Sequence, residues 1–138
     1  MKPSELKIVQ VSPAELIAAE YNPREMTADQ VAALTDSIKR FGLVDPLIVN
    51  SHKDRKNIVV GGHQRLRIAT IMGYETVPVV YVKLTAAKER ELNIRLNKNT
   101  GQWDWENLAN LFEMDELADW GFSESQLVDS FGIMGDEF

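Results

Sequence analysis

The chain has 138 residues, of which 44% are hydrophobic, and a formal net charge of −6, so it is long enough for one compact domain with a core and an appendage. It contains no apolar run near the roughly 18 residues that a membrane span needs and no N-terminal secretory pattern, so we expect a cytoplasmic protein without a membrane partner. The absence of cysteine excludes disulfides, thiolate nucleophiles and cysteine-ligated zinc, and two histidines, His52 and His63, argue against a histidine-rich metal site.

The net charge hides a division along the chain. Residues 1–103 hold all fifteen basic residues and eleven acidic ones, whereas residues 104–138 hold ten acidic residues and no basic one. A mildly basic body can meet phosphates, and an acidic end would repel them or cover the body in competition with them. The alternative interpretation is a solvated helical surface that is simply acidic.

The first predicted elements are an edge strand over residues 5–11, a turn over residues 21–24 and a helix. Thr27 and Gln30 form a capping-box pair at the start of this helix, and Gly42 ends it. Its apolar residues recur at helical spacing, at Val31, Leu34, Ile38 and Phe41.

Residues 47–98 alternate between short apolar strands and helices. We expect Leu92 and Leu96 to face inward from the last helix, and Pro78 to place its strand's start at a sheet edge or a bulge, because proline cannot donate to a ladder. The strands are predicted over 47–49, 58–60 and 77–82, and the helices over 63–72 and 85–98.

Beyond Gly101 the pattern is wholly helical. Asp104 is expected to cap one short helix, and Ser123 with Gln126 forms a second capping box. The chain therefore divides into a domain over residues 1–100 and an acidic helical extension over residues 101–138, whose tail from Gly132 lacks periodicity. The apolar residues expected to pack in this extension are Leu108, Leu111, Phe112, Leu127 and Phe131.

The most informative stretch is Ile58–Ala69, in which an apolar strand runs through Gly61 and Gly62 into a helix that begins His63-Gln64-Arg65. Free backbone N–H groups at a helix N-terminus attract anions, the glycines let an anion approach the main chain, and Arg65 can add a bidentate contact. The pattern favours a phosphate ligand. The alternative is that the glycines only let the helix pack closely on its strand, while Arg65 and Arg67 are solvated.

Other residues are candidates for the same site. Arg24 could neutralise a second phosphate, and Arg90, Asn93 and Asn97 share one polar stripe that could line a cleft or face solvent. His63 could contact a phosphate, transfer a proton or form a helix-start hydrogen bond.

Two acidic residues of the same helix are candidates for catalysis or for Mg²⁺ coordination. Glu91 and Arg95 are spaced for a surface ion pair, and Glu89 is the alternative acid for a Mg²⁺ ion held mainly by phosphate. Trp103 and Trp105 could stack on bases, although anchoring helices to a core is their more common use.

Taken in order, these segments resemble the N-terminal domain of the ParB/sulfiredoxin superfamily over about residues 5–100. The later Asn93–Asn99, Trp103-Asp104 and Trp120-Gly121-Phe122 resemble the variant found in phage and mobile-element proteins, often beside or fused to DNA methyltransferases. The segments that carry the resemblance are Asn22-Pro23-Arg24, Ser37–Gly42, Val44–Val49, Val60–Ala69, and Gly73 before Val77-Pro78-Val79.

The resemblance implies an α+β fold, a small mixed sheet flanked by helices, with a nucleotide or phosphate pocket. Partition proteins of this family bind and hydrolyse CTP and act as DNA clamps, and relatives include ATP-using sulfiredoxins, ADP-using free-serine kinases and members described as nucleases. Arg24 matches the arginine of the first box, Gly61, Gly62, His63 and Arg65 match the second, and Glu91 to Arg95 lie where partition proteins carry Glu-Asn-x-x-Arg.

This chain departs from the partition pattern at two boxes. The second box reads Gly-Gly-His-Gln-Arg in place of Gly-Glu-Arg-Arg, and Leu92 stands where the third wants asparagine, which argues against CTP hydrolysis. Sulfiredoxin chemistry is excluded, because it requires a nucleophilic cysteine.

The leading hypothesis is a ParB-like module that binds nucleotide or nucleic-acid phosphate and acts in phage or plasmid DNA partition, modification or packaging. The expected cofactor is CTP, ATP or ADP with Mg²⁺, and the expected macromolecular partner is DNA. One alternative is a nucleotide-dependent phosphotransferase, hydrolase or nuclease that works by positioning and charge neutralisation. Another is an interaction subunit whose acidic end docks a DNA methyltransferase or a similar partner.

Overall fold

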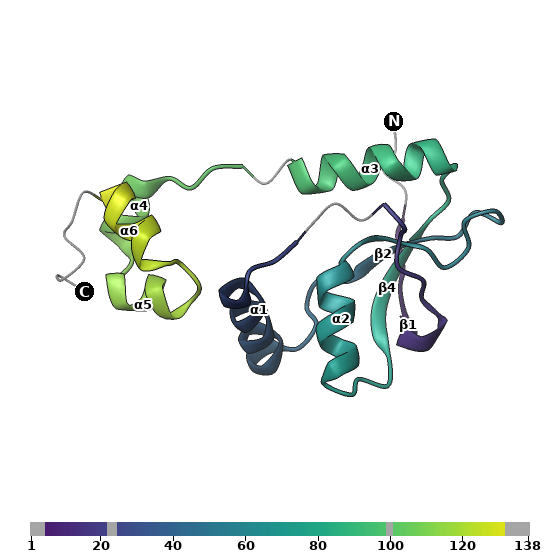
Figure 1. Cartoon of the computed structure of the whole chain (residues 1–138), viewed down its shortest axis with the longest axis horizontal. Coiled ribbons are helices and arrows are strands. Elements are labelled where there is room, and N and C mark those ends of the chain that lie inside the picture. Colours follow the sequence, from purple (N-terminus) through teal and green to yellow (C-terminus); the bar gives the residue numbers. More distant parts are fainter. Residues whose placement is uncertain (1–4, 22–24, 99–100, 132–138) are drawn as a thin grey trace.

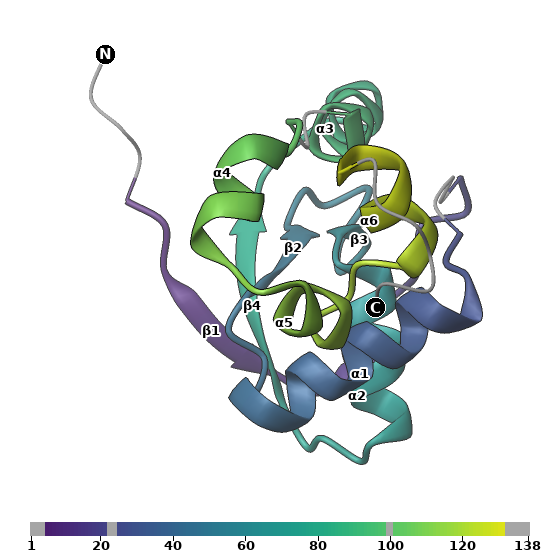
Figure 2. The same cartoon turned by 90° about the vertical axis from the view of Figure 1, so that its left-hand side faces the viewer.

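The body of the protein is a four-stranded mixed sheet with helices packed against it (Figure 1). The computed structural model describes residues 5–21, 25–98 and 101–131. The strand order is β1-β4-β2-β3, with β1 and β3 antiparallel to their neighbours and β2 parallel to β4 (Figure 2). The predicted α+β class is therefore confirmed. The strands are β1 (Ile8–Val11), β2 (Leu47–Asn50), β3 (Val59–Gly61) and β4 (Val77–Val82).

The expectation for Pro78 is confirmed for the start of its strand. As a whole β4 lies between β1 and β2 in the interior of the sheet, but its pairing with β2 begins one residue after Pro78. Proline is tolerated there because the parallel pairing with β2 begins only at Val79, opposite Leu47, so that at Pro78 the strand is flanked by β1 alone. The predicted edge strand at the N-terminus is confirmed as β1.

Helix α1 (Ala28–Phe41) begins and ends as the sequence predicts. The Thr27 hydroxyl accepts from the Gln30 amide while the Gln30 side chain accepts from the Thr27 amide, and Gly42 ends the helix with a φ of 78°. The apolar face is less buried than expected, because Ile38 is buried whereas Phe41 is 71% exposed. The turn expected over residues 21–24 lies largely outside the described residues.

Two further helices position the site. Helix α2 (His63–Ile71) packs on β2 and α1, and α3 (Ala86–Lys98) packs on β3. The main core lies between the sheet and α2 and is built mostly from β-branched residues of the strands, as β propensity predicts. Its fully buried members include Leu47, Val49, Val59, Ala69, Val77 and Val79.

Helices α4 (Trp105–Leu111), α5 (Met114–Asp119) and α6 (Glu124–Phe131) gather around a second, separate core of Leu108, Leu117 and Leu127 (Figure 1). The predicted caps are confirmed, since Asp104 accepts from the Asn107 amide and Ser123 pairs with Gln126. Domain division at residue 100 remains a prediction.

One expectation about packing in this extension is wrong. Leu111 is 73% exposed, because α4 ends at this residue and its buried side is filled by Leu108. Phe112 is 42% exposed but packs edge-on against Trp120. The ring of Phe122 packs edge-on against Trp103 and Trp105, which supports an anchoring role for the two tryptophans. The predicted tail from Gly132 lies outside the described residues. Within those residues, no helix has both the length and the apolar character to cross a bilayer.

Candidate functional site

The glycine turn between β3 and α2 forms a tight corner. Gly62 is the N-cap of α2 and has a φ of 97°, a left-handed conformation that favours glycine. A Cβ at this position would lie 2.4 Å from Leu47 Cδ2 and 2.9 Å from Arg65 Nη2, so space as well as conformation requires glycine. The first intrahelical bond runs from the Leu66 amide to the Gly62 carbonyl, which leaves the preceding N–H groups without an acceptor inside the helix.

This corner forms the floor of a cavity of about 170 Å³. Polar groups come from the glycine turn and α3, and apolar residues come from α1, the segment before it, β3 and α3. The lining residues are Met26, Leu34, Val60, Gly61, Gly62, His63, Gln64, Arg65, Asn93, Leu96 and Asn97.

Arg65 and Arg67 take different positions. Arg65 lines the cavity, with Nη2 donating to the Pro46 carbonyl oxygen over 3.1 Å and lying close to Gly62. Arg67 is exposed. The structure thus places at the corner the arginine that the sequence favours, and the guanidinium is oriented by a carbonyl at the entrance to β2.

His63 also lines the cavity, and its ring reaches the segment before α1. Its Nε2 accepts a hydrogen bond from the Ala19 amide over 3.1 Å. Burial lowers the pKa of His63 below its ordinary value, against the opposing field of the Glu89 carboxylate. The helix-start hydrogen bond is therefore the role that the structure shows among those expected for this residue.

The three residues of the polar stripe expected on α3 do not share one environment: Asn93 and Asn97 line the cavity, and Arg90 does not. Asn93 is 2% exposed and donates through Nδ2 to the Val60 carbonyl oxygen over 2.9 Å, and Asn97 donates to the Asn93 carbonyl oxygen. Arg90 points elsewhere, with its guanidinium 5.4 Å from the centre of the Tyr21 ring, and is absent from the cavity lining. Leu96 lines the cavity but is 41% exposed, so the expectation that it faces inward holds only in part.

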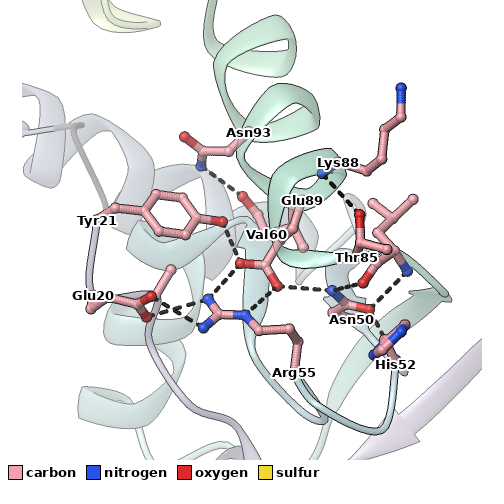
Figure 3. Close-up of polar contacts among 12 residues, drawn as sticks. Glu20, Tyr21, Asn50, His52, Arg55, Val60, Thr85, Lys88, Glu89 and Asn93 are labelled. Atoms are coloured by element: carbon pink, nitrogen blue, oxygen red, sulfur yellow. Dashed lines mark hydrogen bonds and ion pairs between the residues drawn. The ribbon is translucent and has the colours of Figure 1, made fainter.

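Glu89 is the buried centre of a group of polar side chains that bond one another (Figure 3). Its fully buried carboxylate accepts from Tyr21 Oη (2.5 Å), Asn50 Nδ2 (2.8 Å) and Arg55 Nη2 (2.8 Å). Arg55 also pairs with the Glu20 carboxylate, 3.1 Å away. We call Glu20, Tyr21, Asn50, Arg55 and Glu89 the polar cluster.

The charges of the polar cluster stabilise one another. Burial alone would raise the pKa of Glu89, but hydrogen bonds from Arg55, Tyr21 and Asn50 bring it below its ordinary value. Burial and the Glu89 carboxylate raise the pKa of Tyr21, and hydrogen bonds to the two carboxylates raise that of Arg55. Glu89 is therefore an ionised, fully bonded structural group.

The two acidic candidates for Mg²⁺ have different surroundings. Both Glu89 oxygens are engaged by protein donors, which corrects the idea that this residue is available to a metal ion. Glu91 is exposed and forms the predicted ion pair with Arg95 at 3.0 Å. Neither residue lines the cavity, and within the described part of the chain no three acidic or histidine side chains are grouped to hold a metal.

Sequence reasoning missed most of the polar cluster. Arg55 lies in a charged turn over residues 51–57 and looks like a solvated residue, and Tyr21 and Asn50 are 68 and 39 positions from Glu89. No local pattern marks such partners. Arg24, expected at the site, lies outside the described residues.

Comparison with known proteins assigns the family. The protein family described as "ParB N-terminal domain" matches residues 2–100 of this chain. The chain belongs to this family. Among relatives of this ParB N-terminal domain, the ParB-like nuclease domain-containing protein YnaK of Escherichia coli (strain K12) is 36% identical over 75 residues, which are 54% of this chain and 82% of YnaK.

A nucleoid occlusion protein of Bacillus cereus (strain AH187) is 32% identical over 81 residues, and this ParB N-terminal domain spans only 26% of its length. The fold resembles that of the C-terminally truncated chromosome-partitioning protein ParB from Caulobacter crescentus, solved with CTP-gamma-S. The TM-score is 0.66 at 20% identity, over 90% of this chain and 76% of that one, so this likeness supports the fold alone.

Proposed function

We propose that this protein binds a nucleotide through its phosphates at the glycine turn, and that it serves DNA partition, modification or packaging in a phage or plasmid. The observation that carries the proposal is the cavity whose floor is the uncapped N-terminus of α2, beside the oriented Arg65. Amides at a helix N-terminus and a guanidinium in one concave site suit a group with several anionic oxygens.

The shape of the site favours a nucleotide over a DNA backbone. The cavity is a hollow between α1, the glycine turn and α3, into which the end of a small ligand fits more readily than a continuous duplex. Asn93 Oδ1, in the cavity wall, is buried and lacks a hydrogen-bond donor among the described residues. The DNA backbone carries no N–H or O–H group, whereas a ribonucleotide carries hydroxyl groups that can satisfy such an acceptor.

Family membership adds independent support. A ParB with the same fold was solved with a CTP analogue, and the curated relatives include a nucleoid occlusion protein. CTP, ATP and ADP, each with Mg²⁺, are the nucleotides to test. The phage or plasmid setting and a methyltransferase partner rest on the sequence resemblance described above.

The placement of the candidate catalytic residues supports binding rather than hydrolysis. Glu89 is used inside the polar cluster, Glu91 is on the exposed side of α3, and His63 Nε2 is occupied by Ala19. A general base must reach the nucleophile that it activates. None of the three offers a free base to the cavity in this arrangement.

Isothermal titration calorimetry with CTP, ATP, ADP and GTP, each with Mg²⁺, tests the proposal. We expect heat from at least one nucleotide, and a loss of about tenfold or more in affinity for Arg65→Ala, because hydrogen bonds to charged groups contribute about 1.5–3 kcal/mol. Arg67→Ala, two residues along the same helix and exposed, is the matched control and should bind as the wild type does. No heat from any of the four would refute the proposal.

A further inference from the structure

His63 lines the cavity and also bonds the segment that precedes α1. It is one of the residues of the cavity lining, and its Nε2 accepts from the Ala19 amide. Among the described residues, Nδ1 has no hydrogen-bond partner. The two ring nitrogens therefore differ: Nε2 is bonded to the backbone, and Nδ1 is not bonded to any of the described residues.

The bond from Ala19 determines the tautomer of this histidine. A nitrogen that accepts an N–H cannot carry a proton, so a neutral ring with Nε2 as acceptor carries its hydrogen on Nδ1. Burial keeps the ring neutral, since it lowers the pKa of His63. Nδ1–H is thus a hydrogen-bond donor at the first residue of α2, a helix whose N-cap Gly62 supplies no side-chain cap.

The segment that holds this ring is itself fixed. Ile17 pairs with β3 through the Val59 amide and accepts this bond over 2.9 Å, and the two residues after Ala19 are bound by Arg55 and Glu89. The position of Ala19 is therefore fixed by contacts of the residues before it and after it. Because the Ala19 N–H points at Nε2, this nitrogen of His63 is the acceptor.

We propose that His63 contacts the bound phosphate as a neutral hydrogen-bond donor through Nδ1–H, while its Nε2 holds Ala19. One imidazole then joins the ligand to Ala19, the residue before Glu20 and Tyr21 of the polar cluster. This inference rests on the proposed function. A second observation at the same site also indicates a ligand, because Asn93, 2% exposed in the cavity wall, has an unpartnered Oδ1.

The only other histidine of the chain serves as an internal reference. His52 Nδ1 accepts from the Asp54 amide over 3.1 Å, so its neutral form carries the hydrogen on Nε2. The two histidines should therefore be opposite tautomers when neutral. Nitrogen-15 chemical shifts of imidazole distinguish the two tautomers directly. Because the chain has only two histidines, the spectrum of one His variant assigns the signals of both rings.

The first measurement is a nitrogen–proton correlation of the imidazole rings in the intact protein above pH 7, without ligand and with CTP, ATP or ADP and Mg²⁺. We expect Nδ1–H for His63, Nε2–H for His52, and a change of the Nδ1–H signal of His63 on nucleotide addition. A His63 proton on Nε2, or a His63 signal that stays unchanged while calorimetry shows saturation, would overturn the inference and leave nucleotide binding standing. Absence of calorimetric binding would remove the proposed function and the inference together.

Two substitutions separate the two nitrogens. His63→Gln can keep an acceptor for Ala19 but has no donor at the Nδ1 position, so we expect nucleotide affinity to fall about tenfold. His63→Asn can keep the donor near the Nδ1 position but loses the acceptor, so we expect faster hydrogen exchange at the Ala19 amide with a smaller loss of affinity. His52→Gln is the control and should leave affinity unchanged. Equal affinities for His63→Gln and the wild type, with both proteins folded, would contradict the inference.

Discussion

Replacement of Glu89 by glutamine tests whether the polar cluster is a structural unit. The carboxylate is fully buried and accepts from Arg55, Tyr21 and Asn50, and glutamine has a similar shape but removes the charge and one acceptor. Loss of one partner of a buried ion pair costs about 3–5 kcal/mol. Arg55 is 17% exposed and keeps Glu20 as a partner, so we expect the lower end of this range, about 3 kcal/mol.

The assay is urea unfolding followed by far-ultraviolet circular dichroism. Glu91→Gln is the matched control, since Glu91 lies two residues further along α3 and its pair with Arg95 is exposed. We expect no measurable change in the free energy of unfolding for this control. If Glu89→Gln unfolded at the same urea concentration as Glu91→Gln, the polar cluster would not stabilise the fold and the reasoning would be refuted.

Three further predictions concern the glycine turn, the histidine and the second core. Gly62→Ala should lower the free energy of unfolding by about 2–4 kcal/mol in urea, and the control Gly73→Ala by about 1 kcal/mol. Both glycines have a positive φ, but of the two only Gly62 has neighbours within 4 Å of an added Cβ. Equal losses for the two variants would contradict the packing argument. The free energy of unfolding should fall between pH 7 and pH 5, because burial lowers the pKa of His63 and the unfolded chain therefore binds a proton at a higher pH than the folded one. The fall should be shallower for His63→Gln. An identical pH dependence for this variant and the wild type would show that His63 is not its origin. Leu127→Ala should cost the second core about 2–4 kcal/mol, seen by tryptophan fluorescence, and should leave nucleotide affinity intact; a lost affinity would show that the two cores are coupled.

The sequence predicts most elements of this fold because their signals are local. The capping pair at Thr27 and Gln30, the glycines that end helices and the β-branched strands act within a few residues, and each is confirmed. The interior position of β4 in the sheet could not be predicted in the same way. It depends on which strands lie on its two sides, and strand order is set by contacts between distant segments.

The candidate site shows the same division. The glycine turn and Arg65 are contiguous in sequence, so their arrangement follows from one strand and one helix. The burial of Glu89 and Asn93 on α3 could not be predicted from the sequence. Both residues are polar, and their spacing alone suggests a stripe that faces solvent or a ligand. Their burial depends on donors and acceptors supplied by β2 and β3, which no pattern within α3 can reveal.

The hydrogen bonds of α3 also prevent the helix from sliding along the sheet. Glu89 and Asn93 are one turn apart, and each bonds a different strand, Glu89 to Asn50 and Asn93 to the Val60 carbonyl. A displacement of α3 by one turn would place the Glu89 carboxylate against the Val60 carbonyl, where two acceptors face each other without a hydrogen between them. An apolar helix could occupy several such positions with similar energy, whereas this one has a single permitted setting. The α3 residues that border the glycine turn are thereby kept at a constant distance from it.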